Sequence, residues 1–312
     1  MQLVRQNEKQ TTKHHRTVCA VLIALLAAAV ASGCAAESGG GGARGKPAAG
    51  QPGAGAQAGP APAVDTYAER LKRERAARAA AAKKWGLAKV PLAAPAPPAV
   101  KPRITTRKGF EVEGGEGLPP VFTTVPTKER IVFLTMDDGA EKDPELLRMM
   151  TELKIPYSAF LSDYLASDNY GYFKEMQARG VTLSNHTLNH RYLPGLSKAD
   201  QRREICGEQD KIEKYFGKRP TLFRPPYGNY NRDTLRIAKS CGVEAVPLWN
   251  AEAFPDHMEW REWDRDLHPG DIILTHFRGR ADWKGSMADM VRQVMKTITD
   301  KGYAVARLED YV

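Results

Sequence analysis

Two adjacent carboxylates, Asp137 and Asp138, stand between an apolar run and a glycine, Gly139. The β-branched and aromatic residues of the run predict a buried strand over Ile131–Met136, with the acids at its carboxyl end. Because consecutive side chains on a strand point to opposite faces, both acids reach one pocket only if the chain bends, which Gly139 permits. Two carboxylates held together out of water must be hydrogen-bonded, paired with a cation or bound to a metal. Taken alone, the pair is equally typical of solvated aspartates that close a turn.

Two histidines, His186 and His190, follow another expected strand, Val181–Ser184. A helical turn at this place would direct both imidazoles to one side. One carboxylate and two neutral imidazoles make a three-ligand metal site with positions left for water and substrate, which is a catalytic pattern. Zn²⁺ is the expected ion, although Co²⁺, Ni²⁺ or Fe²⁺ also suits these ligands. The neighbouring carboxylate could then act as a general base, and a histidine across the pocket as a general acid.

Three further groups of polar residues follow later strands. They are Arg224-Pro-Pro-Tyr227-Gly228, then Trp249 with Glu252, and finally His276. Each has an ordinary explanation, as a stiff turn, a packed loop or a core histidine. Their shared position after strands is harder to attribute to chance.

The elements that must position these residues alternate between strands and helices over roughly 185 residues, which predicts parallel strands wrapped by helices. We expect strands at Ile131–Met136, Tyr157–Leu161, Val181–Ser184, Thr221–Phe223, Glu244–Trp249, Asp271–Thr275 and Tyr303–Leu308. We expect helices at Asp143–Leu153, Gly171–Arg179, Lys198–Phe216, Arg232–Ser240 and Ser286–Asp300. The fold class is therefore α/β, a distorted barrel of about seven strands, and active sites of such folds gather at the carboxyl ends of the strands.

The motifs carry a family resemblance. Thr135-Met-Asp-Asp-Gly139, His186-Thr-x-x-His190, Arg224-Pro-Pro-Tyr-Gly228 and Leu274-Thr-His276 resemble, in order and rough spacing, four of the five motifs of polysaccharide deacetylases of the NodB-homology type, carbohydrate esterase family 4. The resemblance covers residues 126–312. It implies a distorted (β/α) barrel that removes acetyl groups from N-acetylated sugars with the help of a metal ion.

The resemblance also implies a role for each matched residue. Asp137 would be the general base, His276 the general acid, and Asp138, His186 and His190 the metal ligands. Arg224 would orient Asp137, the backbone N–H of Tyr227 would stabilise the oxyanion, and Leu274 would line the pocket for the acetyl methyl group.

The sequence departs from the family pattern in three places. Met136 stands where Phe is usual, Ala140 where Pro is usual, and Glu252 where an Asp follows Trp249 by three residues. A carboxylate near His276 would raise the pKa of that histidine and favour its protonated form. The aromatic residues of Phe254–Trp263, like Trp249, could form a wall for sugar rings or simply pack within a loop.

The N-terminus has the regions of a secretory signal: basic residues, a short apolar run over Val18–Val30, and small residues before Cys34. We expect a lipoprotein-type signal peptide over residues 1–33 with lipidation of Cys34; simple secretion and an uncleaved anchor are the alternatives. Residues 34–125 read as a low-complexity, disordered tether with a polar helix over 65–85, and residues 126–312 as the catalytic domain.

The basic charge is unevenly distributed. The chain has a net charge of +9, and the leader and tether carry all of it, which leaves residues 126–312 at −1. A nucleic-acid partner is therefore not expected, whereas the tether could favour anionic envelope polymers or lipid headgroups. Cys206 and Cys241 remain in an exported domain and are expected to form a disulfide; two buried thiols are the alternative.

These observations together predict an exported, monomeric, metal-dependent hydrolase that is lipid-anchored at the outer face of the membrane or secreted. The resemblance implies that its substrate is an acetylated polysaccharide containing N-acetylglucosamine, such as chitin-like glycan, peptidoglycan or exopolysaccharide. The alternatives are an O-acetyl esterase of the xylan type and a glycan-binding lipoprotein without activity. An intracellular phosphoryl-transfer enzyme, suggested by Asp-Asp alone, is disfavoured by the leader and the two histidines.

Overall fold

The computed structural model describes residues 66–312 of the 312-residue chain. The chain divides into two units, Met1–Pro62 and Ala63–Val312, and all described residues belong to the second. The expected signal peptide over residues 1–33, the lipidation of Cys34 and the first part of the tether lie outside the described residues. Within the described part, no helix combines the length and the apolar character needed to cross a bilayer.

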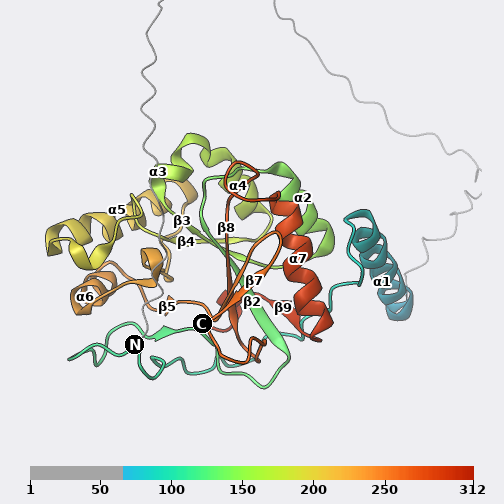
Figure 1. Ribbon diagram of the computed structural model, residues 1–312, viewed down its shortest axis with the longest axis horizontal. Helices are drawn as coiled ribbons and strands as arrows, with labels where there is room; N and C mark the ends of the chain where they lie inside the picture. Colours follow the sequence, from blue (N-terminus) through green and yellow to red (C-terminus); the bar gives the residue numbers. More distant parts are fainter. Residues whose placement is uncertain (1–65) are drawn as a thin grey trace, which may run out of the picture. The chain divides into compact units, whose positions relative to one another are not determined.

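A seven-stranded, mostly parallel sheet forms the centre of the domain (Figure 1). Its strands run in the order β4-β3-β2-β8-β6-β7, and β9 pairs with the first half of β2. Their bounds are β2 (Ile131–Asp138), β3 (Ser158–Leu161), β4 (Thr182–Asn185), β6 (Ala251–Ala253), β7 (Met258–Trp260), β8 (Ile272–His276) and β9 (Ala304–Ala306). All eight residues of β2 are buried, as expected for a strand covered on both faces.

The sheet closes into an irregular barrel through short contacts rather than full strands. A separate two-stranded pair joins β1 (Val121–Phe122) to β5 (Val246–Pro247). Single bridges link β4 to Phe223, Leu222 to Ala245, and Thr124 to Asp271. The expected α/β fold, a distorted barrel, is therefore confirmed, although Thr221–Phe223 contributes only bridges and not the predicted strand.

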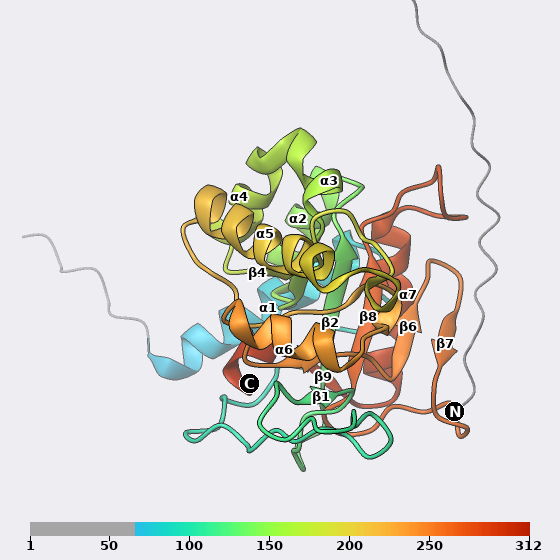
Figure 2. The same cartoon turned by 90° about the vertical axis from the view of Figure 1, so that its left-hand side faces the viewer.

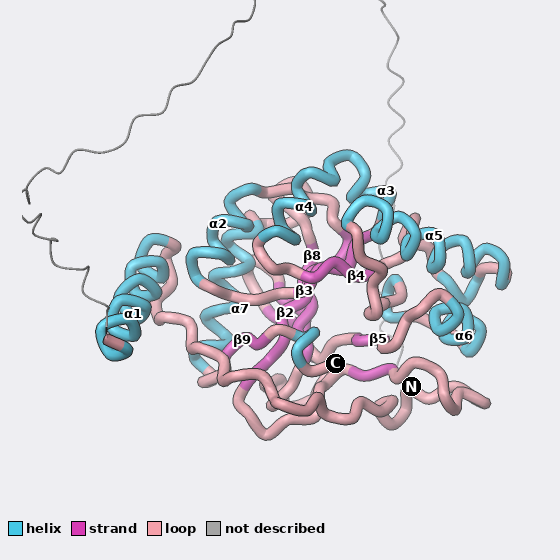
Figure 3. The backbone as a smooth tube through the Cα atoms, turned by 180° about the vertical axis from the view of Figure 1, so that it is seen from behind, coloured by secondary structure: helices cyan, strands magenta, loops and turns pink. Residues whose placement is uncertain are grey.

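The helices pack around this sheet (Figures 1 and 3). They are α1 (Tyr67–Lys84), α2 (Pro144–Leu153), α3 (Asp163–Ala166), α4 (Tyr170–Ala178), α5 (Lys198–Phe216), α6 (Arg232–Ser240) and α7 (Met287–Asp300), with 3-10 turns η1 (Ser167–Asn169), η2 (Leu193–Gly195), η3 (Pro226–Gly228) and η4 (Leu308–Asp310). Helix α2 contacts α7, α4 and α5 both contact β4, and α6 contacts α5. Local signals explain the bounds: Ser197 and Asn231 cap the N-termini of α5 and α6, and Gly217 ends α5 in the left-handed conformation.

The packed domain begins earlier than Pro126, so the expected boundary between tether and domain needs correction. Ala82 and Trp85 are buried against the core, and the Trp85 indole donates to Glu152 Oε2 at 2.7 Å. Val125 is fully buried, and its N–H donates to the carbonyl of Gly270 at 2.8 Å. Residues 86–125 run along the end of the sheet opposite α3 (Figure 2). Their apolar residues are scattered among Pro, Gly and Lys, which is why the segment has no periodicity that would predict packing.

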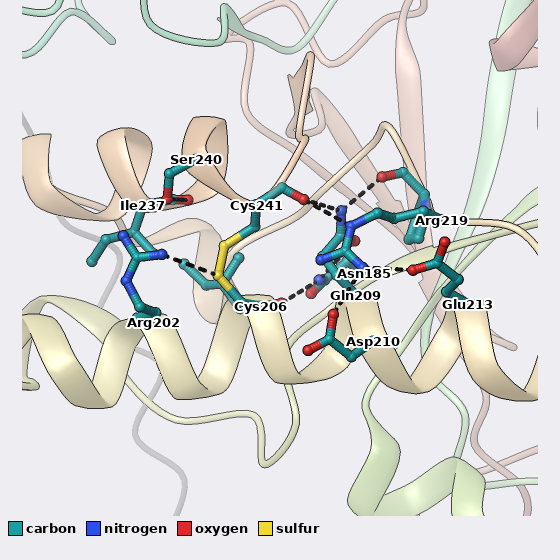
Figure 4. Close-up of a disulfide and its surroundings, with 12 residues drawn as sticks. Asn185, Arg202, Cys206, Gln209, Asp210, Glu213, Arg219, Ile237, Ser240 and Cys241 are labelled. Carbon is teal, nitrogen blue, oxygen red and sulfur yellow. Dashed lines mark hydrogen bonds and ion pairs between the residues drawn. A yellow bond between two sulfur atoms is a disulfide. The ribbon is translucent and has the colours of Figure 1, made fainter.

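A disulfide between Cys206 on α5 and Cys241 at the end of α6 joins the two helices (Figure 4). Figure 4 also shows Gln209 beside Asn185, near the disulfide. Its Nε2 donates to the carbonyl of Cys241 at 3.1 Å, and its Oε1 accepts from Asn185 Nδ2 at 3.0 Å. Since Asn185 is the residue before His186, this chain of hydrogen bonds connects the disulfide to the carboxyl end of β4.

Candidate active site

The two acids at the end of β2 are nearly fully buried, each 2% exposed. The bend that turns both toward one pocket begins at Asp138 itself, with φ +82°, and continues through Gly139, with φ +94°. The prediction placed the bend at Gly139 alone. A non-glycine residue in this region costs of order 1–3 kcal/mol, and such strain persists where the surrounding structure enforces it. A side chain at Gly139 would also press on Phe173, whose Cζ would lie 3.1 Å from the added Cβ.

The two histidines converge on Asp138. His190 Nε2 lies 3.4 Å and His186 Nε2 lies 3.6 Å from Asp138 Oδ1. The predicted helical turn between them is wrong: residues 186–190 form an irregular loop in which Thr187 and His190 have φ +72° and +51°. Two left-handed residues, rather than helical spacing, bring the imidazoles to the same side.

These three residues fit a divalent cation. One ligand atom from each lies within 4.8 Å of the others, and tetrahedral bonds of about 2.0–2.1 Å would separate ligand atoms by about 3.3 Å. Asp138 Oδ1 is buried and has no hydrogen-bond partner. A buried carboxylate oxygen without a partner is unfavourable, unless a cation binds to it. His186 Nδ1 lies 2.7 Å from the carbonyl of Arg224. That carbonyl accepts the Nδ1 proton, so the lone pair on Nε2 is directed at Asp138.

The ionisation states of the cluster suit a metal. Burial lowers the pKa of both His186 and His190 to about 4, so both imidazoles are neutral near pH 7. Burial opposes the ionisation of Asp138, but the nearby imidazoles and Arg278 outweigh it and lower its pKa to about 2. The donor set is therefore one carboxylate and two neutral imidazoles, which first-row divalent ions such as Zn²⁺ prefer.

Asp137 is held by a buried arginine. Arg224 Nη1 donates to Asp137 Oδ1 at 2.7 Å and to Thr135 Oγ1 at 2.9 Å, and its Nε donates to the carbonyl of Pro247. Burial raises the pKa of Asp137 to about 6, against the opposing attraction of Arg224 and His276. A carboxylate in this range is ionised at neutral pH and is a stronger base than an ordinary aspartate.

His276 stands at the end of β8, next to β6. Its Nδ1 lies 3.3 Å from Glu252 Oε1, because β6 and β8 pair with Glu252 opposite Leu274. Burial favours the neutral imidazole, yet the pKa of His276 is raised, because the hydrogen bond to Glu252 and the charge of Asp138 outweigh burial. The longer acid at position 252 therefore reaches the histidine.

The other expected residues line the surroundings of this cluster. Tyr227 has φ +61°, and its ring centroid lies 4.7 Å from that of His190. Leu274 is buried in β8. The guanidinium of Arg261 lies over Trp249, 4.6 Å from the ring centroid. A Cβ at Gly228 would lie 3.2 Å from the same ring, which leaves little room for a side chain there. The expected aromatic wall is not a continuous one, since Trp260 packs against the core while Trp263 is 92% exposed.

Sequence reasoning missed two residues that touch the metal ligands or their loop. Glu204 of α5 is 1% exposed, and its two carboxylate oxygens accept from the backbone N–H and the side-chain amide of Asn189 at 2.8 and 2.9 Å. Arg278 Nη2 donates to Asp138 Oδ2 at 3.2 Å, which leaves Oδ1 for a cation. Arg278 follows His276 by two residues, a spacing that could have drawn attention to it, whereas no local signal marks Glu204.

Comparisons with known proteins agree with this geometry. The sequence model of the family described as "Polysaccharide deacetylase" matches residues 124–246. An uncharacterized protein of Streptomyces coelicolor is 40% identical over 203 residues, which cover 65% of this chain and 81% of that protein. A peptidoglycan-N-acetylglucosamine deacetylase of Bacillus cereus is 28% identical over 188 residues, which cover 55% of this chain and 85% of the relative.

Solved structures with the same fold include members of carbohydrate esterase family 4. A carbohydrate esterase family 4 pseudoenzyme of Bacillus anthracis superimposes with a TM-score of 0.53 at 20% identity, covering 62% of this chain and 69% of that one. A likeness at this identity speaks for the fold alone. Family match, relatives and fold lead to one conclusion: the chain belongs to the polysaccharide deacetylases of carbohydrate esterase family 4.

Proposed function

We propose that this protein is an exported, metal-dependent hydrolase that removes acetyl groups from N-acetylglucosamine residues of a polysaccharide. The observation that carries the proposal is the arrangement of Asp138, His186 and His190 around one point, with Asp137 and His276 beside it. A site that only binds glycans has no need of a base and an acid on two sides of a cation. Relatives named as a peptidoglycan-N-acetylglucosamine deacetylase and as a chitooligosaccharide deacetylase support this substrate class. A further relative is named as a peptidoglycan-N-acetylmuramic acid deacetylase.

The cation would be held by Asp138, His186 and His190, and Zn²⁺ suits this donor set best. When bound there, it supplies Lewis acidity for the acetyl carbonyl and for the attacking water. Arg278 holds the second oxygen of Asp138 and so restricts the carboxylate to one metal-binding atom.

Asp137 takes the proton of the attacking water. Its carboxylate is fixed by Arg224 at 2.7 Å, so that the free oxygen, Oδ2, faces the cluster 3.6 Å from His186 Nε2. A new bond forms between the water oxygen and the acetyl carbon, and the backbone N–H of Tyr227 donates to the oxyanion that develops.

His276 completes the reaction by giving its proton to the sugar nitrogen as the bond between that nitrogen and the acetyl carbon breaks. Acetate and the free amine are the products. Glu252 keeps His276 protonated between turnovers, since the hydrogen bond favours the charged imidazole. We assign Leu274 and Trp249 to the walls around the acetyl group and the sugar.

The direct test is acetate release from N-acetylated chito-oligosaccharides by the zinc-loaded protein and by Asp137→Asn. Loss of one essential group should lower kcat by on the order of a hundredfold or more. Asp210→Asn is a matched control, because Asp210 is an exposed acid of α5 paired with Arg219. Unchanged release by Asp137→Asn would contradict the mechanism. Faster release from acetylated xylan than from the chito-oligosaccharides would instead favour an O-acetyl esterase.

A second candidate, a glycan-binding protein without activity, deserves a test because a pseudoenzyme shares the fold. It predicts tight binding of chito-oligosaccharides with no acetate release at saturating zinc. The intact pairs Asp137–Arg224 and His276–Glu252 favour the enzyme.

Export and membrane attachment are part of the proposal. We propose that residues 1–33 are removed and that Cys34 is lipidated, which would tether a monomeric catalytic domain to the outer face of the membrane. Mass spectrometry of the mature N-terminus tests this; an unmodified peptide that starts elsewhere would contradict lipidation.

A further inference from the structure

A cavity of about 540 Å³ lies at the end of the barrel opposite the active site. Residues that precede β3 and β4, including Tyr157 and Gly180, form one wall, and residues 92–95 with Arg78 of α1 form the other. The volume lies within the range of small-molecule sites, about 300–1,000 Å³. Nothing in the proposed deacetylation uses this cavity.

The charge of the cavity lining is strongly positive. Four cationic side chains line it, against the single carboxylate of Asp310; the cations are Arg78, Lys154, Arg179 and Arg307. Arg179 and Arg307 are partly neutralised, by Glu175 at 2.6 Å and by Glu309 at 3.5 Å.

Two of the cations are not neutralised by any carboxylate among residues 66–312. Arg78 Nη2 donates to the carbonyl of Pro91 at 2.5 Å, and its buried Nε has no hydrogen-bond partner. Lys154 is an exposed residue at the C-terminus of α2. A buried guanidinium N–H without an acceptor is costly, so the site is incomplete as it stands.

The segment that contributes Arg78 and residues 92–95 to the cavity is itself strongly basic. Residues 66–108 contain twelve Lys or Arg against two Asp or Glu, a net charge of +10, while residues 126–312 are close to neutral. A polyanion would therefore be attracted to this end of the domain.

The geometry points to a phosphate group as the ligand, and we infer that the cavity binds a phosphodiester-linked anionic polymer. The four cations come from α1, the ends of α2 and α4, and the segment after β9, so they approach from several directions. The two non-bridging oxygens of a tetrahedral phosphodiester accept donors that approach from several directions, whereas a planar carboxylate accepts mainly in its own plane. A bilayer surface is too flat to enter a concave site, which favours a polymer over lipid headgroups. Such a contact would hold the domain on the envelope while its opposite end works on glycan.

The test measures binding of a fluorescent glycerol-phosphate oligomer to the full chain by anisotropy at low salt. A chelator is present throughout, since a metal at the active site would itself bind phosphate. The double variant Arg78→Gln/Lys154→Gln removes two cations from the cavity. Lys72→Gln/Arg75→Gln is the matched control, because it removes two exposed cations of α1 that do not line the cavity.

We expect the cavity variant to lose at least tenfold in affinity and the control less than threefold, with both unfolding at the wild-type temperature. Inorganic phosphate should compete, and an uncharged oligomer of equal length should not bind. Equal losses in the two variants would show non-specific attraction and overturn the inference. So would an absence of oligomer binding to the wild-type chain under these metal-free conditions. A third outcome is that the chain binds anionic phospholipid vesicles but not the oligomer, and that the cavity variant weakens the vesicle binding. This outcome would contradict a polymer ligand and indicate a membrane surface instead.

Discussion

Glu252 Oε1 lies 3.3 Å from Nδ1 of His276, so the glutamate that stands in place of the family's aspartate contacts the proposed general acid. The two residues lie on adjacent strands, β6 and β8, and the pairing of Glu252 with Leu274 sets their distance. The extra methylene of glutamate is accommodated without losing the contact.

In Glu252→Gln, activity should be lost at a lower pH on the alkaline side of the pH profile than in the wild type. Glu252 raises the pKa of His276, so its removal lowers that pKa, and the protonated acid is then lost at lower pH. The alkaline limb of kcat/KM should therefore move to lower pH. Glu259→Gln is the matched control, since Glu259 lies opposite Glu252 on β7 but is exposed. A limb that stays in place would exclude Glu252 from this role.

The acidic limb of the pH profile should report Asp137. In the metal-free protein its pKa is raised to about 6, mainly by burial; a cation bound nearby favours the carboxylate, so the limb of the metal-loaded enzyme should fall below pH 6. Arg224 lowers the pKa of Asp137, so Arg224→Gln should move the limb to higher pH. Circular dichroism should confirm that the variant is folded. If its acidic limb moves to lower pH instead, the proposed effect of Arg224 on Asp137 is contradicted.

Glu204 should matter for metal affinity although it is not a ligand. Its carboxylate holds Asn189, between the two left-handed residues that aim the histidines. Glu204→Ala should weaken zinc binding by about 10–100-fold, the usual effect of losing an outer partner of a metal site, as measured by competition with a chromophoric chelator.

Glu208→Gln provides the control for Glu204. Glu208 is also buried on α5, one turn further along, and burial raises its pKa well above the usual range. Glutamine mimics its protonated form, so zinc affinity should be unchanged. Equal losses in both variants would mean that α5 as a whole, and not the contact with Asn189, supports the site.

The disulfide should contribute to stability. Closing a loop of this size, with a sequence separation of 35 between the cysteines, stabilises a protein by about 3–4 kcal/mol in the chain-entropy model. Cys206→Ser/Cys241→Ser should lower the free energy of unfolding by that order, measured in denaturant. Because Gln209 connects Cys241 to Asn185, we expect zinc affinity to fall as well; an unchanged unfolding free energy would show that helix packing alone suffices.

Local signals made much of the fold predictable. Helices α5 and α6 have the bounds expected from the sequence, and the structure shows Ser197 and Asn231 capping them. Strand β2 is predictable because its apolar run is continuous. Strands β6 and β7 were missed, since three residues each leave no readable periodicity. The packing of residues 86–125 was missed because its contacts are with residues distant in sequence.

The candidate site was also only partly predictable from the sequence. The identity of the ligands followed from motifs, but their convergence did not follow from helical spacing. It depends on left-handed residues such as Asp138 and Thr187, whose conformations are imposed by tertiary contacts. Glu204 lies fourteen residues after His190 on a polar helix and could be recognised only once α5 was placed against the loop.

Metal binding by the purified chain tests the central claim most directly. Elemental analysis and chelator competition should find one divalent cation per chain, and His190→Ala or Asp138→Asn should weaken zinc binding by at least a hundredfold while Asp210→Asn leaves it unchanged. A chain that binds no stoichiometric metal, or that binds it equally well without His190 and Asp138, would contradict the account.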